Sequence, residues 1–186
     1  MNGVHALVLA GGRGSRMGGV DKGLQLLDGR PLVSHVIERL APQADRLLIS
    51  ANRNLDAYAA LGHAVLPDPP GFEFAGPLAG MLAGLEALPD GAWLLAAPCD
   101  CPHLPADLAE RLLAVAEPHG LAFAHAAREH PTHALLCARL REPLRAHLQA
   151  GGRAVLGWMR SQPHGIARFD DDAAFANLNH PKDLNV

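Results

Sequence analysis

The fold is decided by the stretch V-H-A-L-V-L-A-G-G-R-G-S-R-M-G-G-V-D-K-G, which runs from Val4 to Gly23. Its first part, Val4 to Ala10, is short and apolar with β-branched residues, which favours a buried strand over a helix. The loop that follows combines several glycines with the cations Arg13, Arg16 and Lys22. Glycine allows backbone N–H groups to approach phosphate oxygens, and the cations offset their charge. The pattern therefore favours a phosphate-binding loop over a flexible turn with solvated basic residues.

Two common phosphate-binding loops do not match this spelling. A Walker loop requires a lysine followed by serine or threonine, whereas Lys22 is followed by Gly23. The dinucleotide fingerprint begins at Gly12 and Gly14, but its third glycine position is Met17. The loop is therefore of nucleotide-binding size but of a different kind.

The composition is that of an ordinary globular protein. The chain of 186 residues is 49% hydrophobic with a net charge of -3, which predicts one domain, residues 1–186, with a sizeable core. Because there is no basic excess and only 4% of residues are aromatic, we expect no nucleic-acid partner. No apolar run approaches the ~18 residues that cross a bilayer, and we expect no membrane partner. The 3 cysteines form no disulfide framework and fit a reducing, cytoplasmic location.

Strand and helix patterns alternate along the whole chain. The expected strands are Val4 to Ala10, Leu24 to Leu27, Arg46 to Ala51, Ala64 to Leu66, Trp93 to Ala97, Leu121 to His125, Ala134 to Ala138 and Ile166 to Phe169. The expected helices begin at or near Pro31, Leu55, Gly76, Pro105, Glu142 and Ala154. This alternation predicts the α/β class: a three-layer α/β/α, Rossmann-like nucleotide-binding fold with a mostly parallel sheet.

Polar and glycine-rich segments follow four of these strands. They are the loop from Gly11, Ser50 to Asn52, Asp68, and Asp100. In parallel sheets, ligands collect at the carboxyl ends of the strands. The four segments therefore predict one binding site at that edge of the sheet.

Asp100 is the sharpest candidate for a metal ligand. It lies between two prolines just after a buried strand, where its carboxylate is placed to hold Mg²⁺ together with substrate phosphates. The alternative is a helix cap, but the next helix is expected to begin about five residues later. Cys99-x-Cys101-x-His103 lacks zinc spacing and a second pair, so these thiols are more consistent with packing.

Other polar residues leave several roles open. Asp68 is predicted to bind a ribose hydroxyl or a base edge, or to cap a turn, and Pro69 to Phe74 is expected to be a mobile loop. The stretch His130-Pro131-Thr132, beside Arg128, is expected between two strands, where it would form a polar site or merely a hairpin tip.

No Ser/His/Asp or Cys/His set announces a covalent nucleophile. A phosphate acceptor would need no protein base, because a phosphate monoester is already anionic at neutral pH. Catalysis would then depend on positioning and charge, with Mg²⁺ on Asp100 and with Lys22 and Arg16 over a triphosphate.

The chain resembles the molybdenum cofactor guanylyltransferases of the nucleotidyltransferase superfamily. The resemblance depends on L-A-G-G-x-x-x-R-M-G-G-V-D-K-G from Leu9, A-N-R from Ala51, G-P-L-A-G-M-L from Gly76, P-C-D-x-P from Pro98, H-P-T-x-A-L from His130, and N-x-N-x-P-x-D-L from Asn177. It implies transfer of GMP from GTP to the terminal phosphate of molybdopterin carrying molybdenum, with release of pyrophosphate and use of Mg²⁺. It also implies contact with molybdopterin-donor proteins and apo-molybdoenzymes.

The resemblance also implies roles for single residues. Leu9, Ala10 and Gly11 would hold the nucleotide through backbone groups, Lys22 would contact its phosphates, Asp68 would help to read guanine, and Asp100 would bind Mg²⁺. The remaining residues would surround the nucleotide and the pterin: Gly12, Gly19, Ser50, Gly80, Arg153, Asn177 and Asn179. About 1–100 would bind the nucleotide and about 101–186 the molybdopterin.

Three alternatives remain. Ser50 stands where the family often has asparagine, which leaves open a cytidylyltransferase acting on the same cofactor. A sugar-1-phosphate nucleotidyltransferase is the second alternative, because shorter versions of the first motif occur there. The third is a nucleotide-gated carrier without catalysis, against which Arg16, Lys22 and Asp100 argue.

Overall fold

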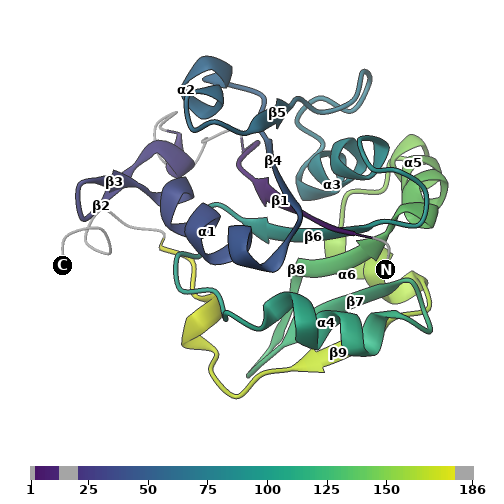
Figure 1. The fold of residues 1–186 in the computed structure, drawn as a ribbon. Helices are drawn as coiled ribbons and strands as arrows, with labels where there is room; N and C mark the ends of the chain where they lie inside the picture. The colour runs from purple at the N-terminus through teal and green to yellow at the C-terminus, as the bar shows by residue number, and fades with distance from the viewer. Residues whose placement is uncertain (1–2, 13–20, 179–186) are drawn as a thin grey trace.

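The computed structural model describes residues 3–12 and 21–178. Its centre is a seven-stranded sheet in the order β5-β4-β1-β6-β8-β7-β9 (Figure 1). The strands are β1 (Val4–Leu9), β4 (Arg46–Ser50), β5 (Ala64–Leu66), β6 (Trp93–Pro98), β7 (Leu121–His125), β8 (Glu129–Cys137) and β9 (Gly165–Arg168). The expected α/β fold is confirmed.

The sheet is mostly parallel, as predicted. β1 pairs in parallel with β4 and β6, β4 with β5, and β7 with β9. Only β8 runs against its neighbours within the described sheet, between β6 and β7. β1 is apolar throughout its middle because it is covered on both faces: Ala6 and Val8 enter one core and Leu7 the other.

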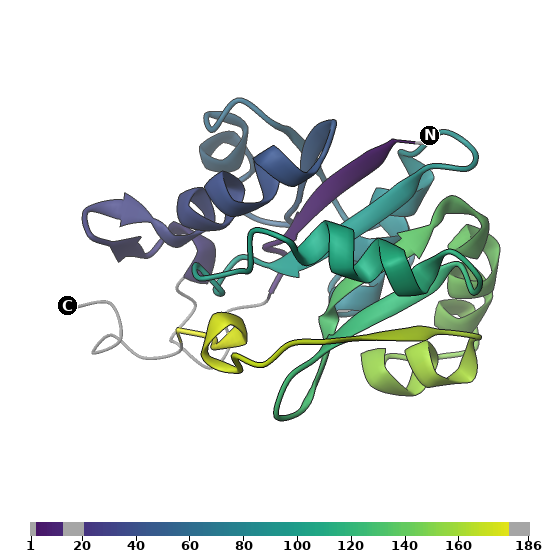
Figure 2. The same ribbon diagram turned by 60° about the horizontal axis from the view of Figure 1, so that its bottom comes forward.

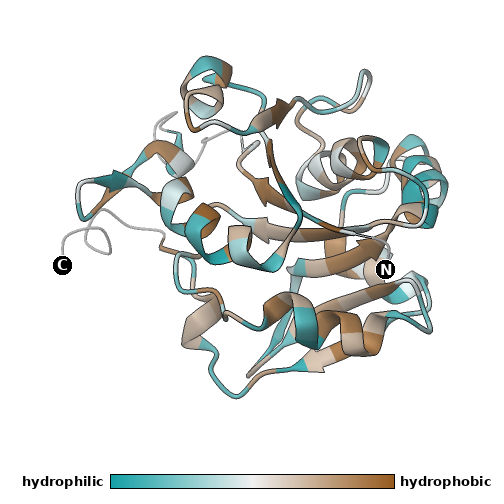
Figure 3. Cartoon of the chain, in the orientation of Figure 1, coloured by the Kyte–Doolittle hydropathy of each residue, from teal (hydrophilic) through white to brown (hydrophobic). Residues whose placement is uncertain are grey.

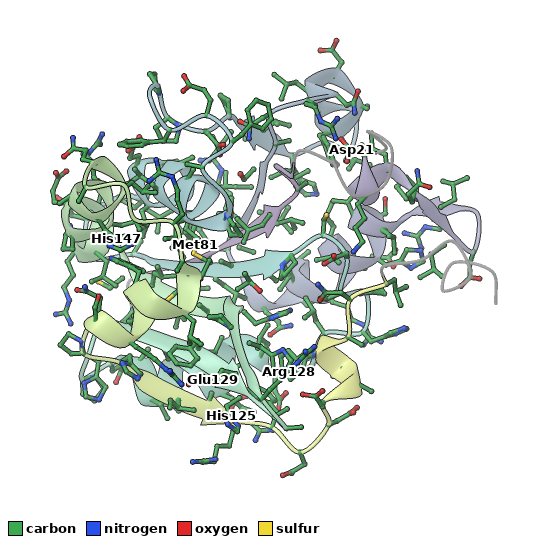
Figure 4. All side chains as sticks on the ribbon, turned by 180° about the vertical axis from the view of Figure 1, so that it is seen from behind. Asp21, Met81, His125, Arg128, Glu129 and His147 are labelled. Atoms are coloured by element: carbon green, nitrogen blue, oxygen red, sulfur yellow. The ribbon has the colours of Figure 1, made fainter. Side chains whose placement is uncertain are left out.

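Helices cover both faces of the sheet and complete three layers. α1 (Leu32–Leu40), α2 (Leu55–Ala59) and α4 (Leu108–Ala116) pack on one face, and α3 (Pro77–Glu86), α5 (Arg141–Gln149) and α6 (Val155–Ser161) on the other. Figure 3 shows the central strands brown, whereas teal stretches mark the outer helix turns and the loops. Figure 4, from behind, shows Met81 of α3 at the sheet. Short 3₁₀ turns are η2 (Lys22–Leu24), η3 (Ala41–Gln43), η4 (Ala138–Leu140) and η5 (Ala173–Phe175).

The expected strand Leu24 to Leu27 is too long. Its first residue belongs to η2, and only Leu26–Leu27 of this stretch forms a strand, β2, which pairs with β3 (Arg30–Pro31) in a separate hairpin. Asp28 and Gly29 both have positive φ, 51° and 76°, which closes the hairpin in two residues. The hairpin projects from the body of the molecule, and Leu26 at its edge is exposed (Figure 1).

The placement of His130-Pro131-Thr132 between two strands is also wrong. These residues lie inside β8, which begins at Glu129. The register shifts between Phe123 and Ala124 of β7, so His130 pairs with Ala124 and Pro131 falls in the irregular stretch. A proline is tolerated at such a bulge because no ladder hydrogen bond from its nitrogen is required.

In the described parts of the chain, no helix has both the length and the apolar character needed to cross a membrane.

Candidate active site

Backbone hydrogen bonds bring the four predicted loops together at the carboxyl edge of the sheet. The Ala10 amide donates to the Ser50 carbonyl at 2.8 Å, and the Cys99 amide donates to the Leu9 carbonyl at 3.1 Å. The Ala51 amide donates to the Leu66 carbonyl at 3.0 Å. These bonds continue the ladder past the strand ends, so the segments after β1, β4, β5 and β6 lie side by side.

Lys22 and Asp100 form an ion pair at this edge, with 2.5 Å between Nζ and Oδ2. The side chains are 23% and 12% exposed, so the pair is shielded from bulk water but still open to a ligand. Lys22 comes from η2, after the glycine-rich loop, and Asp100 follows β6, 78 residues later. The sequence therefore predicted correctly that these two charges share one place.

Asn52 joins three of the strand ends, a role that the sequence reasoning missed. Its Nδ2 donates to Asp68 Oδ2 at 2.7 Å and to the Gly11 carbonyl at 3.4 Å. Its Oδ1 accepts from the Asp68 amide at 2.8 Å. The only signal in the sequence was its position, two residues beyond β4. Asn52 thus fixes the spacing between the glycine-rich loop and the segment after β5.

Asp68 is 7% exposed and holds the loop that follows it. Its Oδ2 also accepts from the Phe74 amide at 2.8 Å, where Phe74 adopts a positive φ of 55°. Burial raises the pKa of the Asp68 carboxyl, and the bonds from Phe74 and Asn52 partly oppose that rise. Both bonds fall on Oδ2, so among the described residues Oδ1 is left for a ligand.

Asp21 fastens the end of the glycine-rich loop immediately before Lys22, and it was not among the predicted site residues. Its carboxylate accepts from the Tyr58 hydroxyl at 2.5 Å and from Asn54 Nδ2 at 2.9 Å (Figure 4). Burial raises the pKa of Tyr58 and keeps its phenol protonated as a donor. A Cβ on Gly23 would lie 2.5 Å from that hydroxyl, so only glycine fits there.

Small residues on α3 allow the helix to lie close to the sheet. A Cβ on Gly80 would lie 2.4 Å from Ser50 Oγ and 3.0 Å from Leu9 Cδ2. Ser50 is only 1% exposed beneath the helix. The close approach that the sequence suggested is therefore between α3 and the strands, and a role of Gly80 or Ser50 beside a nucleotide stays a prediction.

Cys99 and Cys101 are buried on either side of Asp100. Burial raises the pKa of both thiols, which keeps them protonated and poor metal ligands. Cys101 Sγ instead donates to Asn177 Oδ1 at 3.0 Å. The Leu178 amide donates to the Asp100 carbonyl at 3.0 Å, so the segment that carries Asn177 lies against Asp100.

Not every predicted residue lies in this cluster. The Arg153 guanidinium donates to the carbonyls of Leu148 and Gly152 at 2.9 and 2.6 Å, which holds it at the end of α5. Gly12, by contrast, lies at the edge of the cluster: its carbonyl accepts from Arg53 Nη2 at 3.4 Å, next to Asn52. Three predicted residues lie outside the described part of the chain: Arg16, Gly19 and Asn179.

Comparison with known proteins decides the family. Residues 6–164 match the MobA-like NTP transferase domain. The chain belongs to this family. A molybdenum cofactor guanylyltransferase from Cupriavidus pinatubonensis is 47% identical over 191 residues, which cover 98% of this chain and 95% of that protein. One of the same name from Ralstonia nicotianae is 45% identical over 188 residues, covering 95% and 91%.

Solved structures of similar proteins share the fold. The crystal structure of molybdopterin-guanine dinucleotide biosynthesis protein A from Archaeoglobus fulgidus has a TM-score of 0.76 at 20% identity and covers 97% of this chain and 95% of that one. The 2-C-methyl-D-erythritol 4-phosphate cytidylyltransferase from Thermus thermophilus has a TM-score of 0.69 at 17% identity, covering 96% and 94%. At these identities the likeness extends to the three-layer architecture alone.

Proposed function

We propose that this MobA-like NTP transferase transfers GMP from GTP to the terminal phosphate of molybdenum-molybdopterin, forming the guanine dinucleotide cofactor and pyrophosphate. The names of full-length relatives at 45–47% identity support this reaction. The observation that carries it is the Lys22–Asp100 contact at the carboxyl edge. A cation beside a carboxylate at that edge suits a triphosphate and its metal ion.

The residues present fit Mg²⁺. Asp100 offers hard carboxylate oxygens, of which Oδ2 is paired with the Lys22 ammonium in this structure. In the described residues no group of three or more His, Cys, Asp or Glu side chains could hold a metal ion. Mg²⁺ is typically held by one or two carboxylates together with phosphate oxygens and water, so Asp100 would hold it jointly with the nucleotide. When bound, it neutralises charge on the triphosphate.

The chain's own residues then act by position and charge. The terminal phosphate oxygen of the acceptor attacks the α-phosphorus of GTP, and the bond to the β-phosphate breaks to release pyrophosphate. Lys22 stabilises the negative charge that gathers on the phosphates, and Arg16 is assigned the same task. Backbone groups of Leu9, Ala10 and Gly11 hold the nucleotide. No protein base is required, because the attacking oxygen is already anionic.

The two halves of the chain divide the substrates in this proposal. Residues about 1–100 hold GTP, and Asp68 helps to read the guanine. Residues about 101–186 hold the molybdopterin, with Asn177 beside Asp100. The enzyme works in the cytoplasm, receives the pterin from a donor protein and passes the product to an apo-molybdoenzyme.

Pyrophosphate release tests the reaction. The purified protein with Mg²⁺, GTP and molybdenum-molybdopterin should release pyrophosphate and yield a guanine dinucleotide. CTP in place of GTP, and a sugar 1-phosphate in place of the pterin, should give little product. Faster turnover with CTP would favour the cytidylyltransferase, and a labelled nucleotide sugar would favour the sugar transferase. GTP binding without any pyrophosphate release would favour the carrier.

A further inference from the structure

A histidine on β8 holds the segment of chain that ends beside Asp100. His130 is 6% exposed, and its Nε2 lies 2.8 Å from Asp172 Oδ1, which accepts the hydrogen bond in the Nε2–H tautomer. The two residues are 42 positions apart, so the bond joins β8 to the segment after β9. A buried side chain thereby fixes one end of the segment that leads to Asn177.

The ring of His130 also supports that segment from beneath. It stacks on Phe175 of η5, with 4.7 Å between ring centroids and 20° between planes. Phe175 is fully buried and also contacts the Phe169 ring edge-on at 5.1 Å. The stretch from Phe169 to Phe175 is therefore packed on β8 as well as bonded to it. Figure 2 shows this yellow stretch leaving β9 and turning back toward the segment that follows β6.

The same segment ends on Asp100. The Cys101 thiol donates to Asn177 Oδ1 at 3.0 Å, and its sulfur lies 3.6 Å from the Phe175 carbonyl oxygen. The Leu178 amide donates to the Asp100 carbonyl at 3.0 Å. One short stretch, 172–178, thus connects His130 at its start with the proposed metal ligand at its end.

Neighbouring groups strengthen the hydrogen bond between His130 and Asp172. The bond from His130, the charge of Arg128 and the Ala127 amide hold the pKa of the Asp172 carboxyl below its usual range, so Asp172 is an anion at neutral pH. Figure 4 shows Arg128 close to η5. His133 meets the His130 ring edge-on at 5.8 Å, and burial lowers its pKa to about 3. His133 is therefore neutral, and neither of its ring nitrogens has a hydrogen-bond partner among the described residues.

We infer that His130 and Asp172 are positioning residues for guanylyl transfer: they clamp residues 172–178, and the clamp sets the position of Asp100 and Asn177. The inference depends on the proposed function, because Asp100 is taken as the ligand of Mg²⁺. Neither residue touches the reacting atoms. Groups that orient a metal ligand typically change metal affinity or activity about 10–100-fold when they are removed.

Four variants test the role of the His130–Asp172 bond and distinguish it from a general effect of changing this region. Asp172→Ala removes the acceptor, and Asp172→Asn keeps an acceptor oxygen without the charge. His130→Phe keeps an aromatic ring on Phe175 but loses Nε2. Asp170→Asn is the matched control, because it removes an exposed carboxylate two positions away. All are compared below their unfolding temperature, so that only folded protein is measured.

Hydrogen exchange at the Leu178 amide gives a readout that needs neither substrate nor metal. This amide is protected by its bond to the Asp100 carbonyl. We expect Asp172→Ala and His130→Phe to speed its exchange by about tenfold or more, whereas Asp170→Asn leaves it near the wild-type rate. Asp172→Asn, which keeps the acceptor but loses the charge, should give a rate between these two. Unchanged protection in Asp172→Ala would overturn the inference.

The Mg²⁺ concentration for half-maximal pyrophosphate release gives the second readout. We expect it to rise about tenfold in Asp172→Ala and His130→Phe. At saturating Mg²⁺ the KM for GTP should change less than about twofold, because Asn52 and Asp21 hold the nucleotide side separately. Loss of protection with an unchanged Mg²⁺ requirement would also overturn the inference, because the clamp would then not position Asp100. Asp100→Ala at full activity would instead refute the proposed function, while the exchange result on the clamp would stand.

Discussion

The two sides of the site are fastened in different ways. On the side that we propose holds the nucleotide, called the nucleotide side below, the ends of β1, β4 and β5 are joined by one side chain, Asn52, that bonds to residues just beyond its neighbouring strands. On the side that we propose holds the acceptor, called the acceptor side, residues 172–178 are held by His130 of β8 and by the Asp100–Cys101 stretch. Adjacent strand ends make the first side compact, whereas the second depends on contacts between segments far apart in the chain. Asp100 lies where the two sides meet.

The largest effect should come from the cation at that meeting point. Lys22→Ala is expected to lower kcat on the order of 10²–10³-fold, because a fixed charge that faces the transferring phosphates is lost. Lys22→Arg keeps the charge and should lose less. Steady-state pyrophosphate release measures both. If the kcat of Lys22→Ala stayed within a factor of two of wild type, Lys22 would not bind the transferring phosphates.

Removing the link on the nucleotide side should be the next largest change. Asn52→Ala leaves Asp68 with the Phe74 amide as its remaining donor among the described residues and should lower the free energy of unfolding by about 1.5–3 kcal/mol. It should also raise the KM for GTP while the KM for the acceptor stays the same. Denaturant unfolding and substrate-resolved kinetics measure these effects. An equal rise in both KM values would mean that the two sides are not fastened separately.

Much of the nucleotide side was predictable from the sequence, because its anchors directly follow apolar strands. Gly11, Asp68 and Asp100 stand at strand ends, and a parallel sheet brings such ends together whatever the details of packing. The bonds of Asn52 and Asp21 were not predictable, because they depend on side-chain reach across strands. The sequence signalled the two residues only by position, since Asn52 follows a strand and Asp21 ends the glycine-rich loop.

The acceptor side was much harder to predict. The bulge opposite Phe123 and Ala124 carries His130 into β8, and no residue pattern marks such a register shift. The bond from His130 to Asp172 spans 42 residues. The bonds of Asn177 to Cys101 and of Leu178 to Asp100 follow from the path of the chain after β9, which periodicity does not encode. The sequence therefore indicated which residues of the acceptor side are polar, but not which hydrogen bonds they form.

A buried imidazole makes the acceptor side sensitive to acid. Burial lowers the pKa of His133 to about 3, below the ~6.5 of an exposed histidine. The unfolded chain therefore binds the extra proton between these values, so stability falls as pH falls below about 6.5. The loss from this group reaches about 2 kcal/mol at pH 5. His133→Leu should flatten the decline in thermal unfolding temperature between pH 7 and 5. An identical decline in wild type and variant would show that His133 is not its source.

The packing of α3 against the sheet should have the smallest effect on activity, because it changes mainly the stability of the fold. Gly80→Ala places a methyl group against Ser50 Oγ and should cost about 1–3 kcal/mol of stability. Ser50→Gly in the same chain removes both the hydroxyl and its Cβ and should recover part of that loss. Thermal unfolding of the two single variants and the double variant forms a cycle. Strict additivity would mean that the two positions do not touch.

Lys22 and Asp100 together form the proposed binding site of a metal-bound triphosphate. Calorimetric titration of GTP, with and without Mg²⁺, tests it most directly in the wild type, in Asp100→Asn and in the Asp170→Asn control. We predict that Mg²⁺ tightens GTP binding in the wild type and the control, and that Asp100→Asn loses about 10–100-fold of this gain. The same Mg²⁺-dependent gain in all three proteins would contradict the account.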